Sequence, residues 1–410
     1  MTGSSISQTI PIIVAPILTR LYSPEEFGIF ALYVSITTII ASIATGRYEL
    51  AILLPKSNIQ ALNIVGLSMV FSVITGLITI LVVYFFNTQL TSILKAPELS
   101  ASLYFMPITV FLTGIYQSLN YWNNREKKYL NLSKSKVIQA SITSLLNVGM
   151  GFQKFGVSGL IVGTIIGLVF SVIFLIKTTI NRNLNVSKTI QYKKMFALGK
   201  KYSDFLKFAS VSALFNNLSS IGLPIIFGIF FDNAIVGLYY FASRIIRLPL
   251  KLIFNSLSQV YYQKATELYS NDKKSLLIFT WKIQLKIIIF ITPFLVITSL
   301  FAPYAFEIIF GQEWAKAGEY VKYFAPFILS NSLYSPVSSL GSILNKQKQM
   351  LYFNVCLVFS QIFIIYICND HFNFEFTLLI ISIINGLQYL GLQLYMRKTL
   401  KFIISQENLK

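Results

Sequence analysis

The sequence predicts an all-α integral membrane protein with about twelve transmembrane helices, divided six and six. Hydrophobic residues make up 55% of the 410 residues and charged residues only 12%, whereas soluble domains carry about 25% charged residues. Apolar stretches long enough to cross about 30 Å of hydrocarbon recur along the whole chain. None shows the two-residue period of a strand, and a helix satisfies its own backbone groups in lipid.

The expected spans follow one another with short connectors, apart from one longer connector in the middle. They are residues 3–19, 27–46, 61–86, 101–121, 134–152, 156–176, 205–230, 233–255, 282–302, 321–343, 351–369 and 374–396. The long connector predicts an N-terminal six-helix lobe over 1–176, a cytoplasmic linker over 177–204 and a C-terminal six-helix lobe over 205–410. Pro16 to Gly28 and Pro224 to Gly237 place proline and glycine at similar spacings, as a parallel repeat would.

Lysine and arginine gather on one side of the predicted membrane. About 27 of the 34 cationic residues fall in alternate connectors and the C-terminal tail, and 5 fall in the others. This asymmetry predicts that both termini are cytoplasmic. The net charge of +19 is therefore explained by topology rather than by nucleic-acid binding, which would need a basic soluble module.

Residues that could carry out catalysis or bind a metal are scarce. The one histidine, His371, lies in a short connector beside Asp370, so no metal-ligand cluster and no catalytic group are expected. Cys356 and Cys368 lie on one predicted helix about 18 Å apart, beyond disulfide reach. The N-terminus lacks the basic segment of a signal peptide, and we expect a few residues of the natural first helix upstream of it.

Two arginines stand inside the span 233–255, where each costs about 2.5 to 3.5 kcal/mol to insert. Arg244 and Arg247 share a helical face with Tyr240 and Lys251, because the spacings are four, three and four. Pairing with buried carboxylates is one explanation, although few acidic residues lie inside spans. A hydrated cavity that binds an anion is the other, since guanidinium groups bind phosphate oxygens in bidentate fashion.

Other polar residues have two readings each. Arg20 and Arg47 end the first two spans and either reach the interface or line a cavity. Glu49 is a candidate for ion coupling, or it forms a salt bridge with Arg47 or Lys56. Polar residues repeated along one helical face either line a passage or join helices by hydrogen bonds; an example is the set Gln139, Thr143 and Asn147.

Three segments resemble a known family. PILTRLYSPEEFG from Pro16 to Gly28 and RYELAILLPK from Arg47 to Lys56 look like the N-terminal signature of polysaccharide biosynthesis and export proteins, the O-antigen flippases. GLYYFASRIIRLP from Gly237 to Pro249 is similar to the same family. These proteins belong to the multidrug/oligosaccharidyl-lipid/polysaccharide exporter superfamily.

The resemblance implies two lobes around a central cationic cavity in a bacterial inner membrane. The expected substrate is an undecaprenyl-diphosphate-linked oligosaccharide, an O-antigen or other surface polysaccharide unit, moved from the cytoplasmic to the periplasmic face by alternating access. Arg244 and Arg247 would hold its diphosphate or an acidic sugar. Membrane lipids and other polysaccharide assembly proteins are the expected partners. No cofactor is implied beyond a coupling ion, H⁺ or Na⁺.

Two other functions fit the composition. A membrane-embedded polysaccharide polymerase or glycosyltransferase would need a large outer loop with catalytic groups, and the predicted outer connectors are about 18 residues at most. A drug or cation exporter of the same superfamily would be expected to place carboxylates in its cavity. The arginines favour the flippase, which is not an enzyme.

Overall fold

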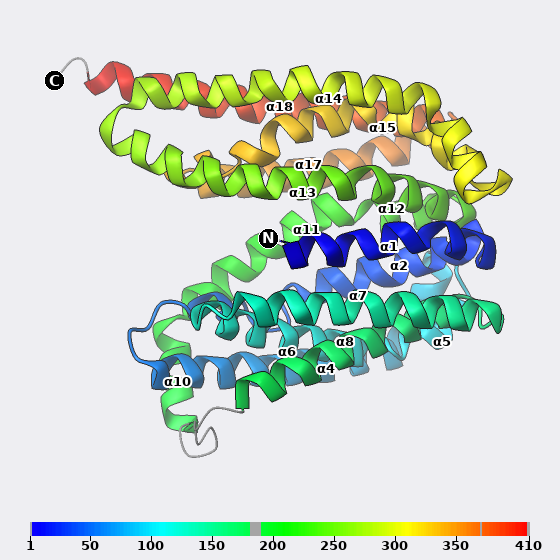
Figure 1. Cartoon of the computed structure of the whole chain (residues 1–410), viewed down its shortest axis with the longest axis horizontal. Helices are drawn as coiled ribbons and strands as arrows, with labels where there is room; N and C mark the ends of the chain where they lie inside the picture. The colour runs from blue at the N-terminus through cyan, green and yellow to red at the C-terminus, as the bar shows by residue number, and fades with distance from the viewer. Residues whose placement is uncertain (1, 181–189, 370, 408–410) are drawn as a thin grey trace. The chain divides into compact units, whose positions relative to one another are not determined.

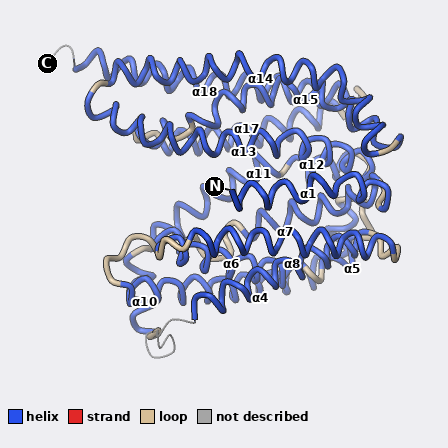
Figure 2. The backbone as a smooth tube through the Cα atoms, in the orientation of Figure 1, coloured by secondary structure: helices blue, strands red, loops and turns tan. Residues whose placement is uncertain are grey.

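The computed structural model describes residues 2–180, 190–369 and 371–407, and within these ranges it contains helices and turns but no strand (Figures 1 and 2). The all-α prediction is confirmed. The chain divides into two compact units, residues 1–237 and 238–410, which are described one at a time. This division lies within a helix, and the predicted lobe boundaries at 176 and 205 stay a prediction.

The first unit is a bundle of long helices joined by tight turns. Its elements are α1 (Thr2–Leu21), α2 (Pro24–Ala41), α3 (Tyr48–Ala51), α4 (Asn58–Ile93), α5 (Leu99–Leu103), α6 (Met106–Arg125), α7 (Tyr129–Phe152), α8 (Val157–Ile180), α10 (Tyr192–Lys201), a π-helical turn (Phe205–Ala209), α11 (Ser210–Ile221) and α12 (Leu223–Phe230).

The second unit contains most of α13, which begins before the boundary between the units. Its elements are α13 (Asn233–Asn271), α14 (Lys273–Phe310), a 3₁₀ turn (Gln312–Trp314), α15 (Ala315–Tyr334), a second 3₁₀ turn (Ser335–Val337), α16 (Leu340–Ile343), α17 (Gln347–Cys368) and α18 (Phe374–Glu407).

Every expected span falls on a helix or a broken helix of the structure. Among the described residues, seven helices are long and apolar enough to cross a membrane, or eight if one bent pair is counted as a single span. The expected spans on α1, α7, α13 and α15 do not meet that criterion. Helix α13 carries the arginines, and α1 is apolar over the shorter stretch Ser5–Leu21. The chain is therefore a multi-pass helical membrane protein, and the count of twelve crossings stays a prediction.

Four expected spans were wrong in detail, because the chain interrupts them; one of these is span 101–121, which turns at residues 104–105 between α5 and α6. Span 27–46 ends early at Ala41, and Gly46 and Arg47 then adopt positive φ angles of 59° and 60°, which a right-handed helix cannot contain. Span 205–230 bends by 57° at Gly222, just before Pro224, and span 321–343 breaks after Tyr334, just before Pro336. Each proline lacks the N–H that would continue the helix.

The corner between α1 and α2 is fixed by a capping box. The Ser23 side chain accepts a hydrogen bond from the Glu26 backbone N–H, and the Glu26 carboxylate accepts one from the Ser23 N–H. Pro24 occupies the first turn, where its missing N–H costs nothing. The Tyr22 hydroxyl donates to the Asn147 carbonyl at 2.7 Å and ties this corner to α7, which packs along α1 (Figure 1).

Helices α7 and α8 form a close hairpin. Gly163 and Gly167 of α8 face Asn147 and Thr143 of α7, and a Cβ added at either glycine would lie 2.1 Å from a side-chain oxygen. These two members of the polar set on α7 therefore pack at a helix interface, as small residues commonly allow in membranes.

Backbone meets backbone where α2 crosses the start of α13. A Cβ on Gly28 would lie 1.8 Å from the Asn233 carbonyl oxygen, and a Cβ on Gly237 would lie 1.8 Å from the Pro24 carbonyl oxygen. Gly28 lies four residues after Pro24, and Gly237 lies four residues after Asn233, so each helix contributes one glycine and one carbonyl to the crossing. The glycines that end the two repeated motifs of the sequence therefore contact each other's helix, and both belong to the first unit.

The described part of the predicted linker folds as a helix against the first unit. Residues 181–189 lie outside the described residues, but α10 packs on α4. Leu198 joins the core around Trp122, and the Gly199 carbonyl accepts a hydrogen bond from Tyr48. Tyr192 and Phe196 are exposed.

A long hairpin of α13 and α14 forms the frame of the second unit. The helices have 39 and 38 residues, about 58 and 57 Å at 1.5 Å per residue. Near the turn, the Tyr261 hydroxyl hydrogen-bonds with Thr280 at 2.9 Å and its ring stacks on Phe279. At the other end, Phe241 of α13 packs against an aromatic cluster of Phe306, Phe310 and Trp314.

Candidate substrate-binding site

The arginines of α13 lie deep along the helix. Arg244 is eleven residues and Arg247 fourteen residues from the first residue, Asn233, about 17 and 21 Å along the axis. In hydrocarbon about 30 Å thick, both positions are near mid-depth. Both side chains are partly exposed.

Arg244 contacts Tyr240, one turn earlier on the same face. Its Nη1 donates to the Tyr240 hydroxyl at 3.2 Å, and the guanidinium carbon is 5.9 Å from the ring centroid. The structure thus brings together two of the predicted site residues. A guanidinium has five N–H donors, so this single hydrogen bond leaves most of them for water or a ligand.

Arg247 lies over the face of Phe327, with 5.4 Å between the guanidinium carbon and the ring centroid. Phe327 belongs to an aromatic cluster with Tyr334, Phe353 and Tyr389. A cation–π contact stabilises the charge without using its hydrogen-bond donors. The guanidinium fork therefore keeps its capacity to bind an anion.

Neither arginine is neutralised by a carboxylate among the described residues. The ion pairs found there are Arg47–Glu49, Lys128–Glu126, Lys264–Glu267, Lys273–Glu407 and Lys316–Glu375. The explanation by buried carboxylates is thus not supported for Arg244 and Arg247. A partly desolvated charge without a counter-ion favours an anionic ligand.

The remaining predicted residues have other surroundings. Lys251 continues the face of Arg244 and Arg247 and is exposed, and Arg20 is exposed at the end of α1. Arg47 and Glu49 belong to the first unit and pair with each other at 3.2 Å. Glu49 is also hydrogen-bonded to Thr45. The expected salt bridge is therefore present, and the coupling role of Glu49 stays a prediction. Arg47 does not end the helix of the second span, because α2 already ends at Ala41; it has a left-handed φ and is the N-cap of α3.

Two structurally important arginines were missed as individual residues. Arg125 donates to the Ile52 carbonyl at 3.0 Å and to Asn58 at 3.1 Å, which holds the turn before α4. Arg397 stacks on Trp281, 4.9 Å from the ring centroid. Both were counted only as connector charges, because no sequence spacing links them to partners 60 to 120 residues away.

Potential metal ligands and thiols are scattered in the described part of the chain. No group of three histidine, cysteine, aspartate or glutamate side chains comes close enough there to hold a metal ion. Cys356 is exposed and Cys368 is buried, and the two thiols are not joined.

Comparison with solved structures places this fold among membrane transporters. A multidrug resistance MATE family transporter of the MOP superfamily, in an inward-facing conformation, matches with a TM-score of 0.70 at 15% identity, over 97% of this chain and 96% of that one. The lipid II flippase MurJ, in an inward closed conformation, matches with a TM-score of 0.71 at 14% identity, over 98% of this chain and 87% of that one.

Residues 17–319 match the model of a family described as polysaccharide biosynthesis protein. The chain belongs to this family, and the resemblance inferred from its motifs is confirmed. No curated protein matches its sequence.

Proposed function

We propose that the protein is a flippase that moves an undecaprenyl-diphosphate-linked oligosaccharide from the cytoplasmic to the periplasmic face of a bacterial inner membrane by alternating access. Arg244 and Arg247 bind the diphosphate, Tyr240 orients Arg244, and the exposed Lys251, one turn beyond Arg247 on the same face, attracts the substrate. The observation that carries the proposal is the pair of mid-depth guanidinium groups without a carboxylate partner among the described residues.

The fold and the family support the same reading. The fold is shared with a protein named as a lipid II flippase, and the family is one of polysaccharide biosynthesis. A drug exporter shares the fold equally well, but a cationic drug would be repelled by two arginines. The structural neighbours are transporters, which favours translocation over polymerase or glycosyltransferase chemistry.

The test is a flipping assay with the purified chain in proteoliposomes that contain a fluorescent lipid-diphosphate oligosaccharide. Arg244→Gln and Arg247→Gln remove charge-assisted hydrogen bonds to phosphate, and each is expected to lower the flipping rate roughly 10- to 100-fold. Lys264→Gln is the matched control, because it removes an exposed charge from the same helix. Wild-type rates in the folded double variant would refute the site.

We further propose that Glu49 couples transport to an ion gradient, with H⁺ or Na⁺ as the ion. It is the one fully buried carboxylate among the described residues, with 1% exposure, and its pairing with Arg47 would break when it bound a cation. Flipping by wild-type protein should accelerate under an imposed gradient of the coupling ion. Flipping by Glu49→Gln should be independent of that gradient, and retained acceleration would refute this role.

A further inference from the structure

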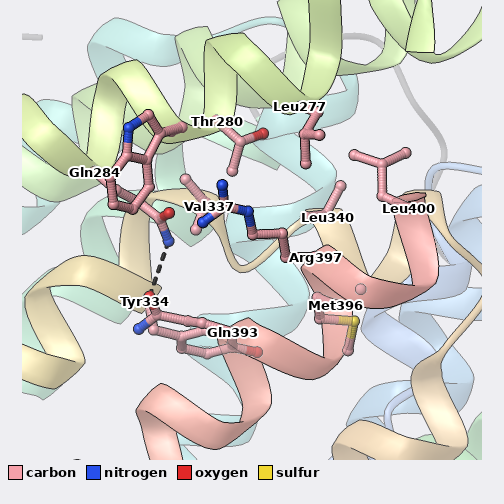
Figure 3. Close-up of a pocket in the computed structure, with 12 residues that line it drawn as sticks. Leu277, Thr280, Gln284, Tyr334, Val337, Leu340, Gln393, Met396, Arg397 and Leu400 are labelled. Carbon is pink, nitrogen blue, oxygen red and sulfur yellow. Dashed lines mark hydrogen bonds between the residues drawn. The ribbon is translucent and has the colours of Figure 1, made fainter. Parts of the chain in front are cut away.

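A second pocket lies within the second unit, away from the two arginines of α13. It is formed by the first turns of α14, the segment from Tyr334 to Gly341 and the second half of α18, and the space between them, with the open solvent at its mouth included, is about 450 Å³ (Figure 3). Neither Arg244 nor Arg247 lines it. The pocket lies near the turn to α14 and the end of α18. This is the end of the unit that carries Lys273, Lys282 and Lys398.

Arg397 extends across this pocket toward α14 (Figure 3). Its guanidinium stacks on Trp281, and its Nε is buried without a hydrogen-bond partner among the described residues. None of the carboxylates described by the structure pairs with it. A buried cationic donor that lacks a partner is costly, so the pocket is suited to an anion.

The rest of the pocket is mostly apolar. The amides of Gln284 and Gln393 are already hydrogen-bonded to each other at 2.9 Å, and Gln393 also donates to the Ser330 carbonyl. Most of the other lining is aliphatic, with Leu277, Val337, Leu340, Met396 and Leu400. One unsatisfied cation beside the exposed indole of Trp281 matches an amphiphile that has one negative headgroup and a hydrocarbon chain.

Helix length predicts that the pocket lies at the depth of a lipid headgroup layer. Arg397 is 23 residues from Phe374, the first residue of α18, about 35 Å along a helix that crosses about 30 Å of hydrocarbon. Trp281 is 45% exposed, and tryptophan is enriched at this interface. Lys282 and Lys398, next in sequence to Trp281 and Arg397, are exposed.

We propose that this pocket binds an anionic phospholipid of the surrounding leaflet. The lipid phosphate accepts hydrogen bonds from Arg397, and one acyl chain lies against the exposed indole of Trp281. Charge complementarity selects an anionic headgroup over a zwitterionic one, whose own cation would compete for the phosphate. This lipid site is independent of the proposed flippase function.

Tryptophan fluorescence tests the proposal directly. Of the three tryptophans, Trp122 and Trp314 are each 1% exposed, so Trp281 is the one open to a contact quencher. The full chain is placed in vesicles of phosphatidylcholine that contain a small fraction of either phosphatidylglycerol or phosphatidylcholine with brominated chains. We expect stronger quenching by brominated phosphatidylglycerol, and no such difference in Trp281→Phe. Equal quenching by the two lipids would overturn the proposal.

Variants and competitors assign the interaction to Arg397 and to a phospholipid. Arg397→Gln should raise the phosphatidylglycerol fraction needed for half-maximal quenching on the order of 10-fold, whereas Lys398→Gln, one residue away, should leave it unchanged. Arg397→Lys keeps the charge and should retain part of the preference if Arg397→Gln does not fold. Inorganic phosphate should not compete. Displacement of phosphatidylglycerol by equimolar polyprenyl phosphate would instead make the pocket a substrate site.

Discussion

Arg47 and Glu49 form an ion pair from which water is largely excluded, with side-chain exposures of 25% and 1%. Removing one member of such a pair leaves the other charge without a partner. The full penalty for a buried pair is about 3 to 5 kcal/mol, and the partial exposure of Arg47 reduces it here.

We therefore expect Glu49→Gln to destabilise the protein by about 2 kcal/mol, measured as a lower Tm in detergent. The double variant Arg47→Gln/Glu49→Gln should recover part of that loss, because no charge is then left unpaired. If the fall in Tm of the double variant equalled the sum of the falls in the two single variants, this account would be contradicted.

At the residue scale, the sequence could predict candidate site residues where a charge is costly to insert into an apolar span. Arg244 and Arg247 stand out because they interrupt an apolar span, and the spacing of four residues predicts the contact of Arg244 with Tyr240. The stacking of Arg397 on Trp281 could not be predicted. It depends on which helices pair in space, and local periodicity does not contain that information.

At the scale of elements, helices α2 and α13 cross with their backbones in contact, at Gly28 and the Asn233 carbonyl. Any side chain there must push two backbones apart. We expect Gly28→Ala and Gly237→Ala each to cost about 1 to 3 kcal/mol from overpacking.

Gly149→Ala on α7 is the control for that experiment, since nothing lies within 4 Å of its added Cβ. Alanine favours a helix over glycine by roughly 0.5 to 1 kcal/mol, so the control should be neutral or stabilising. Thermal unfolding of the three variants decides the matter, and a Gly28→Ala protein as stable as the control would contradict so close a crossing of α2 and α13.

Asp272 caps the start of α14 and gives the hairpin turn a pH dependence. Hydrogen bonds from the Ser275 hydroxyl and backbone N–H lower the pKa of Asp272 below its usual value. The carboxylate therefore stabilises the turn above the pKa of an unfolded aspartate, and this contribution is lost as the pH falls through the lower folded-state pKa.

Hydrogen exchange of the peptide around 268–279, corrected for intrinsic rates, should show this loss on acidification in the wild type. Asp272→Asn should show a flatter profile, since its amide does not titrate. Identical profiles for the two proteins would exclude the cap as the cause.

Among elements, each expected span lies on a helix or a broken helix, but the sequence analysis did not predict the breaks. Hydropathy reports the average environment of about 20 residues, whereas a break such as that after Ala41 depends on backbone angles at Gly46 and Arg47. Likewise, the α10 segment was assigned to a linker, because its apolar residues are few and its core contacts come from the distant α4.

For the molecule as a whole, membrane topology is the property that the charge distribution predicts. In a Cys356→Ser/Cys368→Ser background, Lys154→Cys should react in intact cells with a membrane-impermeant maleimide. Lys264→Cys should react only after the membrane is opened. The reverse pattern would invert the predicted orientation and place the α13–α14 turn outside.

Fold class and family could be recognised at this scale because they depend on many residues at once. Composition, the repeated spans and the PILTRLYSPEEFG motif all agree with the family match over residues 17–319. The substrate could not be recognised in the same way, because its binding depends on the few side chains around Arg244 and Arg247. Transport measurements with variants of these two arginines test it.

The length of the α13–α14 hairpin has a practical consequence. Even a bilayer with its headgroups is only about 40 to 45 Å thick, so helices of about 58 and 57 Å must project into water. Lys273 also pairs with Glu407 of α18, which braces the projection with a third helix. A nanobody raised against this tip would add rigid mass outside the micelle, which would help to align particles of a 410-residue chain in electron cryomicroscopy.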